Sequence, residues 1–376
     1  MSTRKVGGEA RACVGRAGAA LALTLAVGGC GSGGPTPPDP VVGRWPIMGT
    51  FLEVRVWHAD ETRARTALDA AHGEVLRVDS LMSTYRPASE LSRANRAAGT
   101  GRSTPLSPAT AEVLAAALGY ARLSDGALDV TVGPLVDVWG FYGEEGRLPP
   151  RPVLDSARAL TGWRRLALSD SGDSVRLPRA GMRLDFGAIA KGYAVDRAVA
   201  ALRVAGAERA MVDLGGNVGV LGAAPAGGAW RVGLRDPRNP SEALAVVAME
   251  DGAVATSGDY ERFFVADGVR YAHIVDPRTG VPVRGTASVS VLAASALASD
   301  ALSTALYVLG PAEGACLAAA QGVEALWIRD PGPARRGGPP AIEPRHLVVT
   351  PGLEERLELR IGRSGGTPEV ARCRRP

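Results

Sequence analysis

The stretch LDFGAIAKGYAVD, residues 184–196, decides the fold that we expect. It predicts an apolar strand that ends at Asp185, a turn through Gly187 and Ala188, and a helix over residues 190–204. Small residues in the turn let a ligand approach the backbone, and the first turn of a helix carries unpaired N–H groups that attract phosphate. The stretch is therefore a candidate phosphate-binding cradle.

Lys191 lies in the first turn of that predicted helix. The sequence contains only one other lysine, Lys5, among its 43 lysines and arginines. A compact ammonium and a planar guanidinium are not interchangeable, so this choice is informative unless it is accidental. The alternative interpretation is chance in a sequence that is biased toward arginine.

The composition indicates a globular protein that does not bind nucleic acid. The chain has 376 residues, of which 46% are hydrophobic, and this is enough to bury a large core. Its formal net charge is +4, and residues 1–29 contribute +3 of that charge. The remaining part is nearly neutral, which does not give the basic surface that nucleic acid requires.

The N-terminus has the pattern of a secretion signal. A basic segment is followed by the apolar run AALALTLAV at residues 19–27, and the sequence VGGC then ends at Cys30. This ending resembles the lipobox of bacterial lipoproteins, so we expect residues 1–29 to be removed and Cys30 to carry lipid. Residues 30–43, rich in Gly and Pro, would form a tether. An ordinary signal peptide with an incidental cysteine is the alternative.

A lipid anchor would place the protein in the bacterial cell envelope, attached to a membrane and facing the periplasm. Cys316 and Cys373 are the remaining cysteines of the mature chain. An oxidising compartment would permit a disulfide between them. The sequence alone does not pair two cysteines so far apart.

The order of predicted elements indicates an α+β fold and not a doubly wound parallel sheet. Helices are expected at residues 62–81, 108–123, 190–204 and 299–309, and strands at residues 209–214 and 289–293, among others. Residues 175–177 and 182–185 are predicted to pair as one hairpin. We expect one domain over residues 44–363, with a Pro/Gly/Arg loop at 330–340, followed by a disordered tail at 364–376.

Three common kinds of site are not supported by the sequence. The glycines of GGNVGVLG, residues 215–222, lack the dinucleotide-binding spacing and no helical pattern follows them. No cysteines are close enough to form a metal-thiolate site. The segment GRSGG at residues 362–366 matches a nucleophile elbow but lies in the tail, so we interpret it as a chance match.

Asp300 and Thr304 are candidate oxygen ligands for a metal. Four residues apart on a helix, they share one face. A carboxylate and a hydroxyl suit magnesium, which keeps several waters and shares ligands with phosphate. In the alternative interpretation, Asp300 caps the helix and the Thr304 hydroxyl bonds back to the helix backbone.

His273 is a candidate general base. It lies at the end of a predicted strand, just before the turn DPRTG, and Asp276 follows three residues later. The ordinary pKa of histidine lies close to neutrality, which suits proton transfer. A lone histidine at a strand end can equally be structural.

Eight short motifs are spread over almost the whole mature chain. In order they are MGT from Met48, STYRPASELSRAN from Ser83, GALDVTVGPLVDVWGF from Gly126, LDFGAIAKGYAVD from Leu184, VDLGGN from Val212, SGDYERFF from Ser257, HIVDPRTG from His273 and SDALSTALYVLG from Ser299. Together they closely resemble the ApbE family, whose members are FAD:protein FMN transferases and often lipoproteins. The resemblance implies mixed and antiparallel sheets flanked by helices, with an FAD site between subdomains.

The resemblance also implies the reaction and its metal. Family members bind FAD and magnesium, pass the FMN half to a threonine or serine hydroxyl of an acceptor flavoprotein through a phosphodiester, and release AMP. The magnesium ligands carried over by the motifs are Asp300, Thr304 and the backbone carbonyl of Ala188. A metal ion can neutralise the developing charge on phosphoryl oxygens. The implied acceptors belong to respiratory or other extracytoplasmic redox complexes.

The same comparison assigns residues to FAD. By this carry-over Lys191 neutralises phosphate, and the remaining FAD contacts are Met48, Tyr85, Ala127, Leu128, Asp129, Asp185, His273 and Ile274. We expect His273 to take the proton of the acceptor hydroxyl, with Asp276 as second choice. Met48 and Tyr85 could instead be core residues, and the acidic residues could instead cap turns and strand ends.

Two other functions would use the same site. Water as the acceptor would make the protein an FAD pyrophosphohydrolase that yields FMN and AMP. A non-catalytic lipoprotein that stores or delivers FAD is the third hypothesis.

Overall fold

The computed structural model describes residues 39–143, 145–239, 241–329, 346–360 and 367–373. The predicted signal peptide, Cys30, most of the tether and the loop at 330–340 lie outside the described residues.

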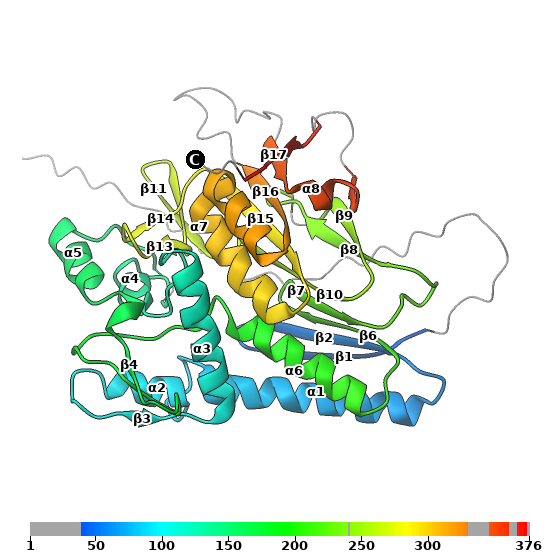
Figure 1. Ribbon diagram of the computed structural model, residues 1–376, viewed down its shortest axis with the longest axis horizontal. Helices are drawn as coiled ribbons and strands as arrows, with labels where there is room; N and C mark the ends of the chain where they lie inside the picture. Colours follow the sequence, from blue (N-terminus) through cyan, green and yellow to red (C-terminus); the bar gives the residue numbers. More distant parts are fainter. Residues whose placement is uncertain (1–38, 144, 240, 330–345, 361–366, 374–376) are drawn as a thin grey trace, which may run out of the picture.

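A nine-stranded sheet forms the centre of the fold (Figure 1). All neighbouring strands pair antiparallel except the last two, which are parallel. The expected α+β class with mixed sheets is confirmed. In spatial order the strands are β1 (Val41–Ile47), β2 (Thr50–Trp57), β6 (Arg209–Leu214), β7 (Asn217–Leu221), β10 (Gly252–Gly258), β15 (Thr286–Ala293), β16 (Glu324–Arg329), β17 (His346–Val349) and β19 (Glu369–Val370).

The sheet is covered on both faces, so its central strands are apolar on both sides. In β16, Ala325 and Trp327 face the main core, whereas Leu326 and Ile328 face a second core. Three helices, among others, pack on the main core, and a three-stranded sheet closes the second (Figure 1). The helices are α1 (Glu61–Met82), α6 (Ala190–Val204) and α7 (Ala296–Gln321), and the small sheet has the order β18 (Leu357–Leu359), β9 (Ala243–Met249), β8 (Trp230–Arg235).

Helix boundaries follow local capping chemistry. Helix α1 starts after Asp60, whose carboxylate accepts from the backbone N–H groups of Thr62 and Arg63. Helix α6 has the predicted bounds. Helix α7 begins earlier than predicted, after Ser295, and continues past a kink at Gly310, where φ is 70° and a proline follows. It is long and apolar enough to span a membrane, but most of it is buried in the protein.

The remaining elements build a smaller lobe and several connections. A third core joins α4, α5 and β13 and contains Trp139 and Phe141. The elements are α2 (Glu90–Arg96), β3 (Thr104–Pro105), α3 (Pro108–Leu123), α4 (Gly133–Val138), α5 (Arg151–Ala159), a 3-10 turn (Trp163–Arg165), β4 (Ala167–Leu168), β5 (Ser174–Arg176), β11 (Phe263–Ala266), β12 (Val269–Ala272), β13 (Val275–Asp276), β14 (Val281–Pro282) and α8 (Pro351–Glu354).

The predicted hairpin of residues 175–177 with 182–185 is wrong. Strand β5 pairs with β3 and β4, and residues 182–185 form no strand. A side chain replaces the missing partner strand: Leu184 N–H donates to Asn95 Oδ1 at 2.7 Å, and Asn95 Nδ2 donates to the Leu184 carbonyl at 3.0 Å. The backbone is therefore satisfied without a ladder.

The predicted disorder of the tail is wrong for its described part. Strand β19 pairs parallel with β17 at the edge of the sheet. Cys373, just beyond it, forms a disulfide with Cys316 of α7. The pairing that the sequence left open therefore fastens the C-terminal segment to the core helix.

Candidate active site

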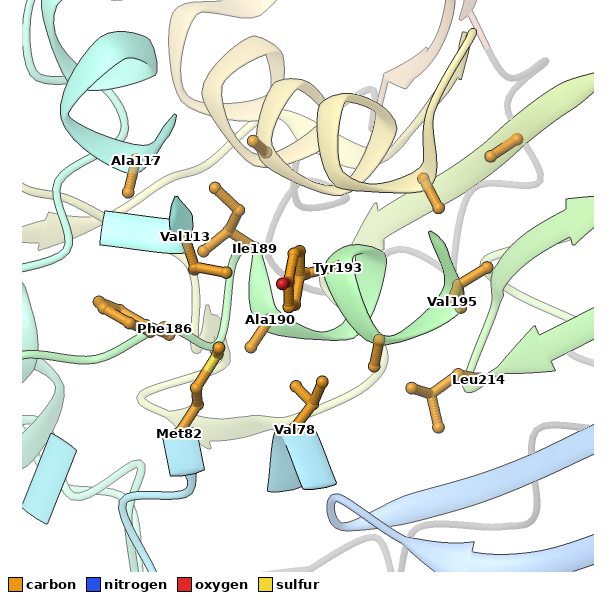
Figure 2. Close-up of a cluster of buried hydrophobic side chains, with 14 of the residues drawn as sticks. Val78, Met82, Val113, Ala117, Phe186, Ile189, Ala190, Tyr193, Val195 and Leu214 are labelled. Carbon is orange, nitrogen blue, oxygen red and sulfur yellow. The ribbon is translucent and has the colours of Figure 1, made fainter. Parts of the chain in front are cut away.

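The stretch at residues 184–196 is held between two helices. Figure 2 shows Phe186, Ile189 and Tyr193 lying among Val78 and Met82 of α1 and Val113 of α3. Phe186 and Ile189 are fully buried, and Tyr193 Oη donates to Glu112 Oε2 at 2.9 Å. This packing fixes the turn that the sequence predicts between strand and helix.

A carboxylate orders the turn itself. Asp185 Oδ1 accepts from the Gly187 N–H at 2.6 Å, and Asp185 Oδ2 accepts from the Tyr142 hydroxyl. A Cβ at position 187 would lie 2.9 Å from Asp185 Oδ1, so the close approach of this carboxylate to the turn requires glycine at position 187. The guanidinium of Arg183 lies 3.9 Å from the centroid of the Tyr142 ring. Burial beside the Asp185 carboxylate raises the pKa of Tyr142, so its hydroxyl stays a donor.

The start of α6 differs from the open phosphate cradle that the sequence predicts. The Ile189 and Ala190 N–H groups already donate to the Phe186 carbonyl. The Gly192 N–H donates to Asp300 Oδ2 at 2.9 Å, so a carboxylate of this chain occupies the positive end of the helix. A Cβ at Gly192 would lie 2.2 Å from the Ala296 carbonyl oxygen, so glycine allows this close approach of α6 and α7.

Lys191 links the turn to that carboxylate. Its Nζ donates to the Gly187 carbonyl at 3.1 Å and lies 4.0 Å from Asp300 Oδ1. The Asp300 side chain is only 6% exposed, and burial raises its pKa above the ordinary value although Lys191 counteracts this. Among the described residues, the only cation near this buried carboxylate is an ammonium 4.0 Å away, so the carboxylate is well placed to bind a further cation.

Asp196, the last residue of the stretch, anchors the other side of this site. Its two carboxylate oxygens accept from the N–H groups of Ala296 and Leu297, at 2.7 and 2.9 Å. It thereby caps α7 together with Ser295. Asp300 lies one turn inside the helix and does not cap α7, so the interpretation of Asp300 as its cap is wrong.

The predicted metal ligands meet the chemical requirements for magnesium. Thr304 lies one turn after Asp300, and its Oγ1 is 3.1 Å from the Ser257 hydroxyl of β10. Lys191 brings the turn that contains Ala188 next to Asp300. One carboxylate, one hydroxyl and one carbonyl are hard oxygen donors, and magnesium commonly completes such a set with waters and phosphate. Among the described residues, no group of three His, Cys, Asp or Glu side chains offers a competing metal site.

His273 is held in one tautomer next to two cations. Its Nδ1 lies 3.2 Å from the Arg262 carbonyl oxygen, which can only accept, so Nδ1 carries the proton and Nε2 keeps its lone pair. Removal from water, with smaller contributions from the Arg262 and Lys191 charges, lowers the pKa of His273 to about 4. The ring is therefore neutral at pH 7 and able to accept a proton. Ile274, which follows it, is buried, and its carbonyl accepts from Val283.

Asp276, the second candidate base, is engaged in its own turn. Its Oδ1 accepts from the backbone N–H and Nε of Arg278, and its Oδ2 accepts from Arg278 Nη2 at 3.0 Å. These contacts favour a role in shaping the turn over a role as base.

Met48 is partly buried and packs against the main core, whereas Tyr85 is exposed. Met48 has φ of 51° in the turn between β1 and β2, a conformation that costs energy for a residue other than glycine and that often marks a functional position. Tyr85 is 62% exposed, so its interpretation as a core residue is wrong. Its hydroxyl accepts from Arg262 Nη1 at 3.3 Å, and its ring meets Tyr142 edge-on.

Residues 127–129 line the other end of the region. Ala127 and Leu128 are buried, and the Asp129 carboxylate accepts from Thr131 and from the Trp163 backbone N–H. This carboxylate therefore orders the loop, and burial raises its pKa. A cavity of about 420 Å³ opens beside it, lined by Asp125, Gly126, Asp129, Thr161, Gly162, Trp163, Arg164, Arg165, Pro277 and Arg278.

An unsatisfied donor lies in one of the residues beside the cavity. The buried indole N–H of Trp163 has no hydrogen-bond partner among the described residues. Arg164 lies over the Trp163 ring, 4.4 Å from its centroid.

The comparisons with known proteins decide the family. The family model described as "ApbE family" matches residues 48–327. The chain belongs to the ApbE family. The FAD:protein FMN transferase of Vibrio cholerae is 36% identical over 318 residues, which cover 82% of this chain and 92% of that protein. The FAD:protein FMN transferase of Escherichia coli K12 is 33% identical over 70% of this chain and 77% of its own length.

Solved ApbE structures have the same fold. The ApbE protein of Thermotoga maritima matches with a TM-score of 0.73 and 34% identity, over 79% of this chain and 97% of that one. The flavin transferase ApbE of Vibrio cholerae matches with a TM-score of 0.69 and 35% identity, over 78% and 94%. The fold expected from the resemblance to the ApbE family is thus confirmed.

Sequence reasoning missed several residues of the site. Ser257 and Arg262 lie inside the SGDYERFF motif, so a signal was present, but the motif does not say which side chains face α7 and His273. Asp196 likewise ends the decisive stretch without being recognised as the cap of a distant helix. Tyr142 and Trp163 lie outside any pattern that we used, and only the three-dimensional structure brings them to the site.

Proposed function

We propose that this ApbE-family chain transfers the FMN half of FAD to a threonine or serine hydroxyl of an acceptor flavoprotein and depends on magnesium. One observation carries the proposal. His273 is neutral, its Nε2 is available, and the positive charge of Lys191 acts on it. Lys191 also connects the turn at Gly187 to the buried carboxylate of Asp300. We infer that a base, a cation and a metal ligand would meet around this one turn.

His273 would act on the acceptor hydroxyl. As its oxygen attacks the FMN phosphorus, Nε2 takes the proton, the new P–O bond forms and the bond to the AMP phosphate breaks. The two electrons of the broken bond leave with AMP. The low pKa of His273 keeps Nε2 unprotonated in the free enzyme, so the base is ready without prior loss of a proton.

Lys191, Asp300, Thr304 and the Ala188 carbonyl would neutralise the pyrophosphate and hold the metal. A magnesium ion bound by the last three would stabilise the charge that develops on the phosphoryl oxygens. Lys191 adds a positive charge that this chain supplies itself, and its contact with the Gly187 carbonyl orients that charge along the turn.

Met48, Tyr85 and Asp185 would surround the flavin half of FAD. A thioether and an exposed aromatic ring suit a flat, polarisable ring system. The cavity of about 420 Å³ beside Asp129 would take another part of FAD.

We also propose that the protein works outside the cytoplasm as a lipoprotein anchored through Cys30. The VGGC sequence before a Gly/Pro-rich tether supports this, and the disulfide between Cys316 and Cys373 suits an oxidising compartment. Radiolabelled palmitate incorporated into the wild type and not into Cys30→Ser would support the anchor. Equal labelling of both proteins would contradict it.

The test of the activity uses purified protein, FAD, MgCl2 and a threonine-bearing acceptor domain. We expect a fluorescent acceptor band that survives denaturing electrophoresis, and no band when the accepting threonine is valine or when EDTA is present. AMP and free FMN formed without an acceptor would favour the pyrophosphohydrolase. Tight FAD binding without any AMP would favour a storage protein.

A further inference from the structure

Three hydroxyl groups form a cluster between β10 and α7. Ser257 Oγ of β10 lies 2.8 Å from Ser303 Oγ and 3.1 Å from Thr304 Oγ1, both on α7. Ser303 is buried, and its Oγ lies 2.9 Å from the backbone carbonyl oxygen of Asp300. We refer to Ser257, Ser303 and Thr304 as the hydroxyl cluster.

Only one arrangement of protons satisfies all three contacts. A carbonyl oxygen can only accept, so Ser303 must donate its single proton to the Asp300 carbonyl. Ser303 then has no proton left for Ser257, so Ser257 donates to Ser303. Ser257 has in turn no proton for Thr304, so Thr304 donates to Ser257. The hydroxyl cluster therefore has a fixed direction that begins at Thr304.

This direction fixes which side of the Thr304 oxygen carries its lone pairs. The Thr304 proton points toward β10, and the described residues provide no hydrogen-bond donor to its oxygen. A hydroxyl binds a metal through a lone pair, so its proton must point away from the ion. From these contacts we propose that Ser257 is a positioning residue, which accepts the Thr304 proton so that the Thr304 oxygen presents its lone pairs to a divalent cation.

The Thr304 hydroxyl has two possible acceptors. A threonine inside a helix commonly donates to the carbonyl four residues earlier, which for Thr304 is that of Asp300. That carbonyl accepts from Ser303, and the Thr304 hydroxyl contacts Ser257 instead. Ser257 itself lies in a strand that is paired with β15 opposite Val289, so its position is fixed by the sheet. The sheet thereby orients a predicted ligand on the helix.

This inference rests on the proposed metal-dependent function, and its test reads metal binding instead of transfer. Mn²⁺ affinity is measured by electron paramagnetic resonance on folded protein without FAD. We expect Ser257→Ala to bind Mn²⁺ about tenfold more weakly than wild type, since partners of metal ligands typically change affinity by roughly 10- to 100-fold. FAD affinity in EDTA should stay within about twofold of wild type.

A matched control lies one residue earlier on the same strand. The Thr256 hydroxyl lies 2.7 Å from Ser290 Oγ of β15 and so belongs to a different contact from that of Thr304. Thr256→Val removes a comparable hydroxyl contact and should leave Mn²⁺ affinity within about twofold of wild type. Ser303→Ala frees the Ser257 proton to turn toward Thr304, so it should weaken binding too, though less than Ser257→Ala.

Wild-type Mn²⁺ affinity in folded Ser257→Ala would overturn the proposal. If that variant does not fold, wild-type affinity in Ser303→Ala would overturn it equally. Failure of the proposed function can be told apart from failure of this inference. Wild-type protein that binds Mn²⁺ but transfers no FMN would contradict the transferase function. The Mn²⁺ affinities of the variants relative to wild type would still decide the role of Ser257. Wild type that binds no divalent metal would contradict both.

Discussion

Asp300→Asn should separate the stability of the protein from its metal binding. The substitution keeps the shape of the side chain and an oxygen for the Gly192 N–H but removes a buried charge. Because burial raises the pKa of Asp300 above 3.8, the folded state binds more protons than the unfolded state from about pH 3.8 up to the raised value. Stability from this group therefore falls as the pH rises through that window and stays lower at pH 7.

The metal-free variant is accordingly expected to be at least as stable as wild type at pH 7. Each unit by which burial raises the pKa of Asp300 lowers the free energy of unfolding at pH 7 by about 1.4 kcal/mol. The ion pair with Lys191 is partly exposed and therefore offsets little of this loss. Magnesium should stabilise only the wild type: at about 100 times its Kd it adds about 2.7 kcal/mol, which for a domain of this size raises Tm by roughly 5 °C.

Thermal unfolding with MgCl2 or EDTA measures both effects. The control is Asp213→Asn, because burial raises the pKa of Asp213 to about 6 and its carboxylate accepts from the nearby Gly216 N–H. That variant should keep the magnesium shift. An Asp300→Asn protein that keeps the shift, or that unfolds more than 5 °C below wild type in EDTA, would refute this reasoning.

Three further predictions concern single side chains. His273→Ala should lower the transfer rate by about 10²- to 10⁴-fold while FAD affinity is retained. Because the pKa of His273 is about 4, protonation of this base should not lower wild-type kcat/KM between pH 8 and pH 6, and a loss of activity with a midpoint near pH 6.5 would contradict the assignment. Lys191→Ala should weaken FAD binding in a titration more than it lowers Tm, and normal FAD affinity with a lower Tm would reverse that interpretation. Cys316→Ser should lower the free energy of unfolding in urea by at most about 4 kcal/mol, because the disulfide closes a loop of 57 residues in the unfolded chain. An unchanged free energy of unfolding would mean that the bond does not hold the C-terminal segment in place.

Local patterns predicted the helices and the sheet strands well. Helix α6 has its predicted bounds because its apolar residues keep helical spacing and the chain turns at Gly206. The hairpin before it was predicted wrongly, because an amide side chain, Asn95, satisfies the Leu184 backbone as a neighbouring strand would. Sequence periodicity does not distinguish these two partners.

The motifs predict which residues form the candidate site, and the structure adds contacts that the motifs do not indicate. The structure places Lys191 next to Asp300, and the Lys191 charge acts on His273, while the roles assigned to these residues stay predictions. The motifs did not indicate that Asp300 occupies the start of α6, where the stretch alone predicted free N–H groups for phosphate. Long-range contacts of this kind, 108 residues apart, leave no local signal in one sequence.

The central claim is tested most directly by measuring AMP and protein-bound FMN in one reaction. Wild-type protein, FAD and MgCl2 are incubated with the threonine-bearing acceptor domain, AMP is quantified by chromatography, and bound FMN is quantified by intact mass. We predict one AMP for each FMN attached, with the attachment lost when the accepting threonine is valine. AMP in excess over an unmodified acceptor, or no consumption of FAD, would contradict the account.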